Sequence, residues 1–184
     1  MPLFSETSDV SVRPAVPGDE LAIAQVQLAA WRDTHADVFG TALDDLDAEA
    51  ISAGWHESIT APPGPGYRVL VALAGPQVVG FAAVAPVAAP EGEARGGVLV
   101  ALEVTPTAQR GGHGSRLLAA VVDLLREDGA DQLHTWVLDG DDARARFLRE
   151  SGLGPDDVAR EVVAGTLPDG THRTVNEHRW SAGI

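Results

Sequence analysis

The sequence predicts an α/β protein built on one central mixed β-sheet with helices packed against it. Two observations carry this prediction. Short apolar or alternating segments of strand length recur along the chain, and longer segments with helical spacing separate them. Their order is strand, two helices, three strands, helix, strand, helix and two strands, which is typical of one sheet covered by helices. We expect six to seven strands and about four helices in a single domain, residues 1–184.

The N-terminal part begins with a strand and two helices. Residues 10–15 alternate in polarity, as a half-buried strand does. A Pro-Gly-Asp sequence then opens a segment that has an acidic first turn and apolar residues at helical spacing up to Trp31. Residues 44–59 form a second, acidic helical segment. The Pro- and Gly-rich residues 61–66 are a connection.

Strands dominate the middle of the chain. Residues 67–73 and 77–87 are apolar runs joined by a Gly-Pro turn, which predicts a hairpin. Residues 97–106 are almost continuously apolar, as expected for a strand that is buried on both faces.

The C-terminal part alternates between helices and strands. An amphipathic helix follows a glycine-rich segment and ends at Asp128-Gly129. The acidic DGDD at 139–142 supplies carboxylates to the start of the next helix. The other predicted elements are a strand at 132–138, a helix through Glu150, and a closing hairpin of residues 157–165 and 172–180 around an LPDG turn.

Composition limits the classes of function. The net charge is -14, from 27 acidic and 13 basic residues, all of the latter Arg. This balance disfavours general nucleic-acid binding; it suits a cationic substrate or simply solubility. The chain has no Cys, which excludes disulfides, thiolate metal sites and a cysteine nucleophile. Without a signal peptide or a membrane-length apolar run, we expect a cytoplasmic protein with no membrane partner.

The residues QRGGHGSRLL, 109–118, predict an anion site. Their three glycines follow a buried strand and precede an apolar helix. Backbone N–H groups at a helix start lack partners within the helix, and the helix dipole adds positive potential there. Glycine lets an anion approach these groups closely, and the usual anion is a phosphate.

Two common phosphate loops do not fit this segment. A P-loop requires Lys, and the chain has none. A dinucleotide-binding turn requires a glycine where Leu117 stands, and it follows the first strand of its unit rather than the fourth. These departures argue against a nucleotide-binding protein.

The glycine-rich residues 109–115 resemble the Q/R-x-x-G-x-G/A signature of the GNAT superfamily of N-acetyltransferases. The preceding strand ends in Val-x-Pro at 104–106, as the resemblance requires. Residues 12–35 are similar to the family's first strand and substrate-side helices. FLRESGL at 147–153 is similar to its Phe-Tyr-x-x-x-Gly-Phe segment. The resemblance implies the GNAT fold over nearly the whole chain.

This resemblance implies acetyl-CoA, or a related acyl-CoA, as cosubstrate. In the family, backbone amides of the signature hold the diphosphate, and the pantetheine arm lies along the fourth strand where it splays from the fifth. Leu102 and Val104 would contact that arm through backbone groups. Arg116 is either an additional charge near the phosphates or a solvated helix residue. The other implied cofactor-binding residues are Gln109, Arg110, Gly111, Gly112, Gly114, Ser115 and Asp141, the last standing nearest to a family Asn.

Glu103 and Val104 are the candidate catalytic residues. The family meets the oxyanion with an N–H near the end of its fourth strand, which implies that of Val104. Glu103 is the only acid in the apolar run, and apolar surroundings favour a carboxylate that takes up a proton, as a general base does. Strand alternation places Glu103 opposite Leu102 and Val104, so a carboxylate that faces solvent or pairs with an Arg is an equal alternative. His134 is a weaker candidate base, since a structural role is commoner.

The chain departs from the family at the residue that often protonates the CoA sulfur. That Tyr is replaced by Leu148, and the only Tyr of the chain, Tyr67, begins a different strand. A thiol with the pKa of free Cys, about 8.5, leaves as thiolate without much help. A slower enzyme, a water acting as acid, and a degenerate acyl-CoA binder all fit.

We therefore predict an N-acetyltransferase that moves an acetyl group to a primary amine by direct attack. The alternative is a catalytically degenerate acyl-CoA-binding or regulatory module on the same fold. Polyamines, aminoglycosides and protein N-termini are all compatible acceptors. Trp31 and His35 are candidates to line the acceptor pocket, although a core role is commoner for Trp31. We expect no metal, and the family allows a homodimer.

Overall fold

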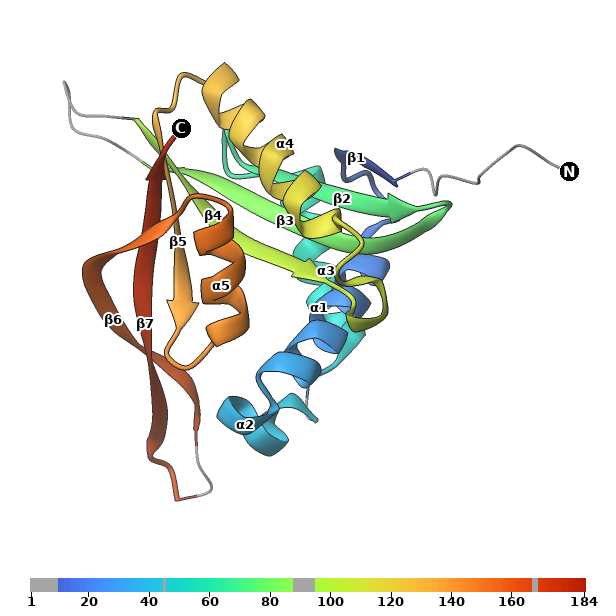
Figure 1. The fold of residues 1–184 in the computed structure, drawn as a ribbon. Coiled ribbons are helices and arrows are strands. Elements are labelled where there is room, and N and C mark those ends of the chain that lie inside the picture. The colour runs from blue at the N-terminus through green and yellow to red at the C-terminus, as the bar shows by residue number, and fades with distance from the viewer. Residues whose placement is uncertain (1–9, 45, 88–94, 167–168) are drawn as a thin grey trace, which may run out of the picture.

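One mixed sheet organises the part of the chain that a computed structural model describes, residues 10–44, 46–87, 95–166 and 169–184. Its seven strands have the spatial order β1-β2-β3-β4-β5-β7-β6 (Figure 1). All neighbours are antiparallel except β4 and β5, which are parallel. The predicted class and strand number are confirmed. The strands are β1 (Val10–Pro14), β2 (Arg68–Ala74), β3 (Gln77–Val87), β4 (Gly96–Val104), β5 (Gln132–Leu138), β6 (Gly154–Thr166) and β7 (His172–Gly183).

Five α-helices lie in the described residues, where the sequence indicates about four. The extra helix, α2, is a single turn between the two predicted N-terminal helices. The first of these ends at His35, whose backbone N–H still bonds to the Trp31 carbonyl, and Gly40 ends α2 with a φ of 54°. The helices are α1 (Glu20–Thr34), α2 (Ala36–Phe39), α3 (Ala48–Thr60), α4 (His113–Glu127) and α5 (Asp142–Glu150), with 3-10 turns η1 (Gly40–Leu43) and η2 (Pro106–Ala108).

The second N-terminal helix, α3, begins later than the sequence predicts. Asp47 is its N-cap, and the Asp47 side chain accepts a hydrogen bond from the Glu49 N–H (3.0 Å). An acidic residue at this position supplies an acceptor to the free donors of the first turn, so acidity marks the start of a helix as well as its interior. Residues 167–168 of the predicted LPDG turn lie outside the described residues.

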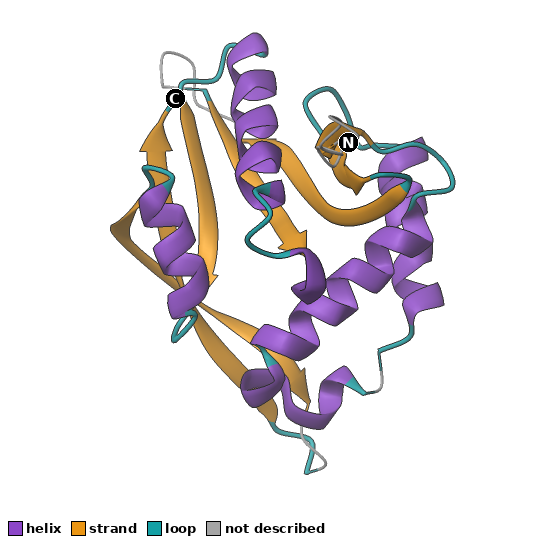
Figure 2. Ribbon diagram, turned by 45° about the vertical axis from the view of Figure 1, so that its right-hand side comes forward, coloured by secondary structure: helices purple, strands orange, loops and turns teal. Residues whose placement is uncertain are grey.

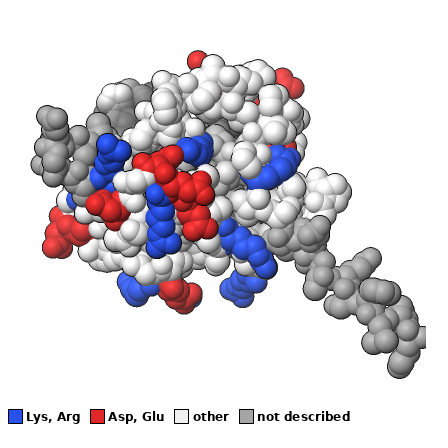
Figure 3. All heavy atoms as spheres, turned by 90° about the horizontal axis from the view of Figure 1, so that it is seen from above, with Lys and Arg blue, Asp and Glu red and all other residues white. Residues whose placement is uncertain are grey.

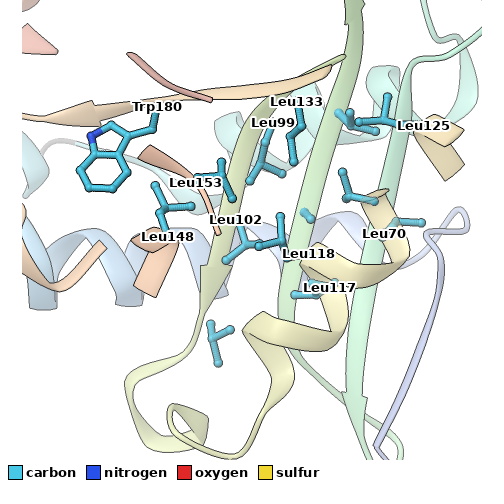
Figure 4. Close-up of a cluster of buried hydrophobic side chains, with 14 of the residues drawn as sticks. Leu70, Leu99, Leu102, Leu117, Leu118, Leu125, Leu133, Leu148, Leu153 and Trp180 are labelled. Carbon is cyan, nitrogen blue, oxygen red and sulfur yellow. The ribbon is translucent and has the colours of Figure 1, made fainter. Parts of the chain in front are cut away.

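The helices cover both faces of the sheet (Figure 2). Those on one face, α4 and α5, contribute Leu117 and Leu148 to the larger buried cluster, which Figure 4 shows against the strands. On the other face, Ile23 of α1 packs with Phe81 of β3, and Trp55 of α3 meets the Phe81 ring edge-on at 5.0 Å. Each fully buried Leu, Ile or Phe side chain contributes roughly 1.5–3 kcal/mol, which holds the helices to the sheet.

Pairing between β4 and β5 is short, and the two strands then diverge. Only Gly96–Leu99 and Gln132–Thr135 pair within the described chain. At the last pair, the buried Thr135 hydroxyl donates to the Leu99 carbonyl (2.9 Å). Beyond it, β4 stays with β3 and β5 stays with β7. We call the point of divergence, after Leu99 and Thr135, the fork.

A glycine brings β3 close to the end of β4. Gly80 pairs with Val104. A Cβ on Gly80 would come within 2.9 Å of the Glu103 carbonyl and 3.2 Å of a Val104 methyl group. Because these contacts are too short for a side chain, glycine allows β3 and β4 to pack tightly at the end of β4.

The outer surface carries charges of both signs. Seen from above in Figure 3, arginine and acidic side chains lie next to one another on this face. None of the helices in the described ranges is both long enough and apolar enough to cross a membrane.

Candidate active site

The glycine-rich turn after β4 presents free N–H groups at the start of α4. Gly112 precedes the helix with a φ of 80°, and Arg110 also has a positive φ, 62°. The first helical hydrogen bond joins the Arg116 N–H to the Gly112 carbonyl (3.1 Å). The N–H groups of residues 113–115 therefore stand before the helical ladder, as the first donors of a helix do. Together with the positive end of the helix dipole, they suit an anion.

This helix start opens onto a cleft of about 420 Å³, which we call the α4 cleft. Its volume is in the range typical of ligand sites. Most of the residues predicted from the sequence to bind the cofactor or to act in catalysis line it; Gly111, Arg116 and His134 do not. The Gly111 carbonyl instead accepts a hydrogen bond from Nη1 of Arg116 (3.0 Å), so Arg116 braces the turn. The candidates that line the cleft are Leu102, Glu103, Val104, Gln109, Arg110, Gly112, Gly114, Ser115 and Asp141.

The end of β4 turns a backbone edge toward the fork. The Thr105 N–H donates to the Val79 carbonyl of β3 (2.8 Å). Backbone groups of successive residues point to opposite edges of a strand, so those of Leu102 and Val104 point away from β3. The Leu102 carbonyl accepts a hydrogen bond from Arg144 of α5 (2.8 Å). The N–H groups of Leu102 and Val104 face the same edge.

A largely buried charge network spans the fork. Nη2 of Arg144 donates to Oε1 of Glu103 (2.7 Å), and Nε of Arg144 lies 3.8 Å from Oδ2 of Asp141. Nε2 of His35 lies 3.9 Å from the same Asp141 oxygen. The four side chains are only 8–18% exposed. The network therefore joins α1, β4 and α5 at one point.

Glu103 is not the isolated carboxylate that the apolar run suggests. The structure shows the other reading, a carboxylate paired with an arginine. The hydrogen bond from Arg144 holds the Glu103 carboxylate at the fork, where it lines both clefts. His134, the weaker candidate, lines neither this cleft nor the one described next.

A second cleft, of about 270 Å³, lies on the other side of the charge network. It is bounded by the ends of α1 and α2, by β4 and β5, and by the β6–β7 hairpin, and we call it the hairpin cleft. Trp31 and His35 both line it. Glu103, Asp141 and Arg144 line both clefts. A molecule in either cleft can therefore approach the same charged wall.

The chain matches the model of a known protein family. The model of the acetyltransferase (GNAT) family matches residues 28–154, which include the fork, the glycine-rich turn and α5. The chain belongs to the GNAT acetyltransferase family. No curated protein sequence matches it.

Solved structures share the GNAT fold of this chain. The PaiA N-acetyltransferase of Thermoplasma acidophilum, in complex with coenzyme A, superposes with a TM-score of 0.76 at 14% identity, covering 96% of this chain and 99% of its own. The ribosomal-protein-alanine N-acetyltransferase of Brucella melitensis gives a TM-score of 0.70 at 24% identity, covering 95% and 99%. The ribosomal-protein-S18-alanine N-acetyltransferase of Escherichia coli gives 0.63 at 16%, covering 95% and 94%. At these identities the likeness concerns the fold.

Leu148 gives this GNAT chain an apolar residue at the position of the often-used Tyr. Leu148 is 0% exposed and belongs to the main core (Figure 4). Arg144 stands one helical turn earlier on the same face of α5. The helix therefore brings a guanidinium, rather than a phenol, to the fork. Tyr67, which immediately precedes β2, is 40% exposed and lines neither cleft.

Arg144 and His113 also line the α4 cleft and were not predicted to do so from the sequence. An arginine in a helix is usually solvated, and only the spacing of Arg144 from Leu148 indicates that it faces inward. Asp141 was expected to cap α5, and its Oδ1 does accept a hydrogen bond from the Arg144 N–H (2.9 Å). His113 lines the α4 cleft, is 6% exposed, and its Nδ1 has no hydrogen-bond partner among the described residues.

Burial of His113 predicts a pH-dependent cost to stability. Desolvation, and to a lesser degree Arg116, lowers the pKa of His113. As the pH falls through about 6.5, His113 therefore becomes protonated in the unfolded chain but stays neutral in the folded chain. This difference lowers the free energy of unfolding below that pH. We expect His113→Leu to raise the free energy of unfolding by about 1 kcal/mol at about pH 8, and by more at about pH 5.5.

Urea unfolding of both proteins at the two pH values measures this difference. Other titrating groups are common to both proteins and cancel in the comparison. An equal gap at both pH values would show that the imidazole titrates alike in the folded and unfolded chains.

Proposed function

We propose that this GNAT chain transfers an acetyl group from acetyl-CoA to a primary amine. The observation that carries the proposal is the fork, where two clefts meet at one wall formed by Glu103, Asp141 and Arg144. A transferase needs such a meeting point, because its two substrates enter separately and react at one atom.

The α4 cleft suits acetyl-CoA. Residues 110–115 bring backbone N–H groups and the helix dipole to bear on a diphosphate. The N–H groups of Leu102 and Val104 suit the amide carbonyls of a pantetheine arm, which would lie beside β4 as another strand would. The coenzyme A bound to the Thermoplasma relative supports this choice of cosubstrate. We further propose that residues 1–184 form a single acetyltransferase domain, in keeping with neighbours that cover 95–96% of the chain.

The chemistry is direct attack of the amine on the thioester carbon. The Val104 N–H is the candidate donor to the oxyanion that then forms. Glu103 is the candidate base, since its carboxylate lines both clefts and can accept the proton that the nitrogen loses. The C–S bond then breaks and CoA leaves as a thiolate. Arg144, one turn from Leu148, places positive charge near the departing sulfur where no phenol is present.

A catalytically degenerate acyl-CoA binder on the same fold is the second candidate. Leu148 favours it, because this buried side chain has no proton to give the thiolate. The two candidates differ in one observable: a binder takes up CoA but releases no free thiol with any amine.

Truncated thioesters test how the cosubstrate is held. S-acetylpantetheine keeps the reacting bond but lacks the phosphates, and S-acetyl-4′-phosphopantetheine restores one of them. We expect kcat/KM to fall at least about 100-fold from acetyl-CoA to S-acetylpantetheine, with partial recovery for the phosphorylated form. Free-thiol release measures all three. Equal kcat/KM values for the three thioesters would show that the start of α4 does not bind the phosphates of the cosubstrate.

Glu103→Gln tests the base. The amide keeps the shape and can accept a hydrogen bond from Arg144, but it cannot take up a proton, so kcat should fall about 100-fold or more with little change in KM for acetyl-CoA. Glu161→Gln, an exposed carboxylate of β6, is the matched control and should keep wild-type kcat. If Glu103→Gln keeps more than half of the wild-type kcat, Glu103 is not the group that accepts the proton from the amine.

A further inference from the structure

We infer that the hairpin cleft selects a small primary amine carried on a flat apolar body, such as an arylalkylamine. The inference rests on the proposed function and names the class of its acceptor. It concerns the cleft of about 270 Å³ that lies across the charge network from the α4 cleft.

The position of the cleft fits an acceptor site. Glu103 of β4 belongs to the walls of both clefts, and so do Asp141 and Arg144 at the start of α5. Glu103 alternates with Leu102 and Val104, whose side chains pack in the core on the α4 side. The nitrogen of an amine bound beside Glu103 in the hairpin cleft therefore reaches the fork from the face of the sheet opposite the start of α4.

The outer walls of the cleft are apolar and partly aromatic. The Trp31 and Phe39 rings are nearly parallel, at 16°, with centroids 6.1 Å apart. Trp136 of β5 also lines the cleft, and the guanidinium of Arg160 lies over its ring, 4.0 Å from the centroid. The aliphatic lining residues are Val100, Ala101, Leu138, Val162, Val163, Ala164 and Val175. Such walls gain most from a flat apolar ligand, because they bury it without leaving polar groups unpaired.

The charge of the cleft suits one cation at its inner end. Glu103 and Asp141 share the single guanidinium of Arg144 there, and their side chains are 13% and 8% exposed. The third carboxylate of the cleft, Glu177, is paired with Arg160 at 2.6 Å. Apart from His35, the charged side chains at the inner end carry one net negative charge, which an ammonium there would meet. Farther out, the valines offer a second cation no partner, and the Trp136 ring already lies under the guanidinium of Arg160.

This distribution disfavours the other acceptors considered. A polyamine or an aminoglycoside carries several ammonium groups, and burying one of them against an apolar wall is costly without a partner. A peptide would bring backbone amide groups against apolar walls that offer them few partners. A monoamine with an aromatic ring matches both the charge and the walls.

An acceptor panel with acetyl-CoA tests the inference by free-thiol release. The probes are 2-phenylethylamine, n-butylamine, spermidine, kanamycin and a peptide that begins with alanine. We expect kcat/KM for 2-phenylethylamine to exceed that for spermidine, kanamycin and the peptide by about 100-fold, and that for n-butylamine by about 10-fold.

Two exposed valines provide a matched pair of variants. Val100 lines the cleft and is 61% exposed, so Val100→Asp places a charge in the apolar wall without burying it in the core. We expect KM for 2-phenylethylamine to rise about 10-fold, with KM for acetyl-CoA unchanged. Val158 of β6 is 38% exposed and lines neither cleft, so Val158→Asp should leave both constants unchanged.

The possible outcomes distinguish a wrong acceptor class from a wrong proposed function. Thiol release that is fastest with spermidine, kanamycin or the peptide, or a Val100→Asp variant that behaves like Val158→Asp, would overturn the inference and leave acetyl transfer standing. Binding of CoA with no thiol release on any amine would overturn the proposed function itself, and the acceptor class with it.

Discussion

The site depends on one feature of the sheet: parallel pairing between β4 and β5 stops after Leu99 and Thr135. A continuous parallel ladder would satisfy the edge of β4 with backbone groups of β5. Because the ladder stops, β5 leaves the outer edge of β4 at Leu102 and Val104: side chains of Arg144 and Gln109 bond to the two carbonyls there, and clefts form on the two sides of the fork. Both strands keep their other neighbour: β4 pairs with β3 on either side of a register shift at Val100, and β5 pairs with β7 along its length. The opening therefore lies inside the sheet and not at its edge.

Groups at the ends of three helices give the fork its chemistry. The start of α4 contributes free N–H groups, and α5 contributes Arg144 and Asp141. The last turn of α1 leads into His35, within 3.9 Å of Asp141. Since Arg144 also bonds to the Leu102 carbonyl, the cation is tied to the strand edge that a thioester would approach. In a family that often uses a phenol at α5, this chain combines a buried Leu148 with a guanidinium one turn away.

Most of the fold could be predicted from the sequence, because strand and helix periodicities reflect burial, which the two faces of the sheet enforce. The glycine-rich helix start was also predictable, since Gly112 adopts the positive φ of 80° that glycine permits just before α4. Two features were not. The pairing of Glu103 with Arg144 joins residues that are far apart in the chain, and the single turn of α2 depends on how α1 ends. Neither leaves a periodic pattern, so only the three-dimensional arrangement reveals them.

A crystal structure of the chain with coenzyme A bound tests the account most directly. The account predicts diphosphate oxygens within hydrogen-bond distance of the N–H groups of residues 112–115, and the sulfur at the fork beside Val104. A coenzyme bound elsewhere on the surface, with Arg144 still filling the fork, would contradict it.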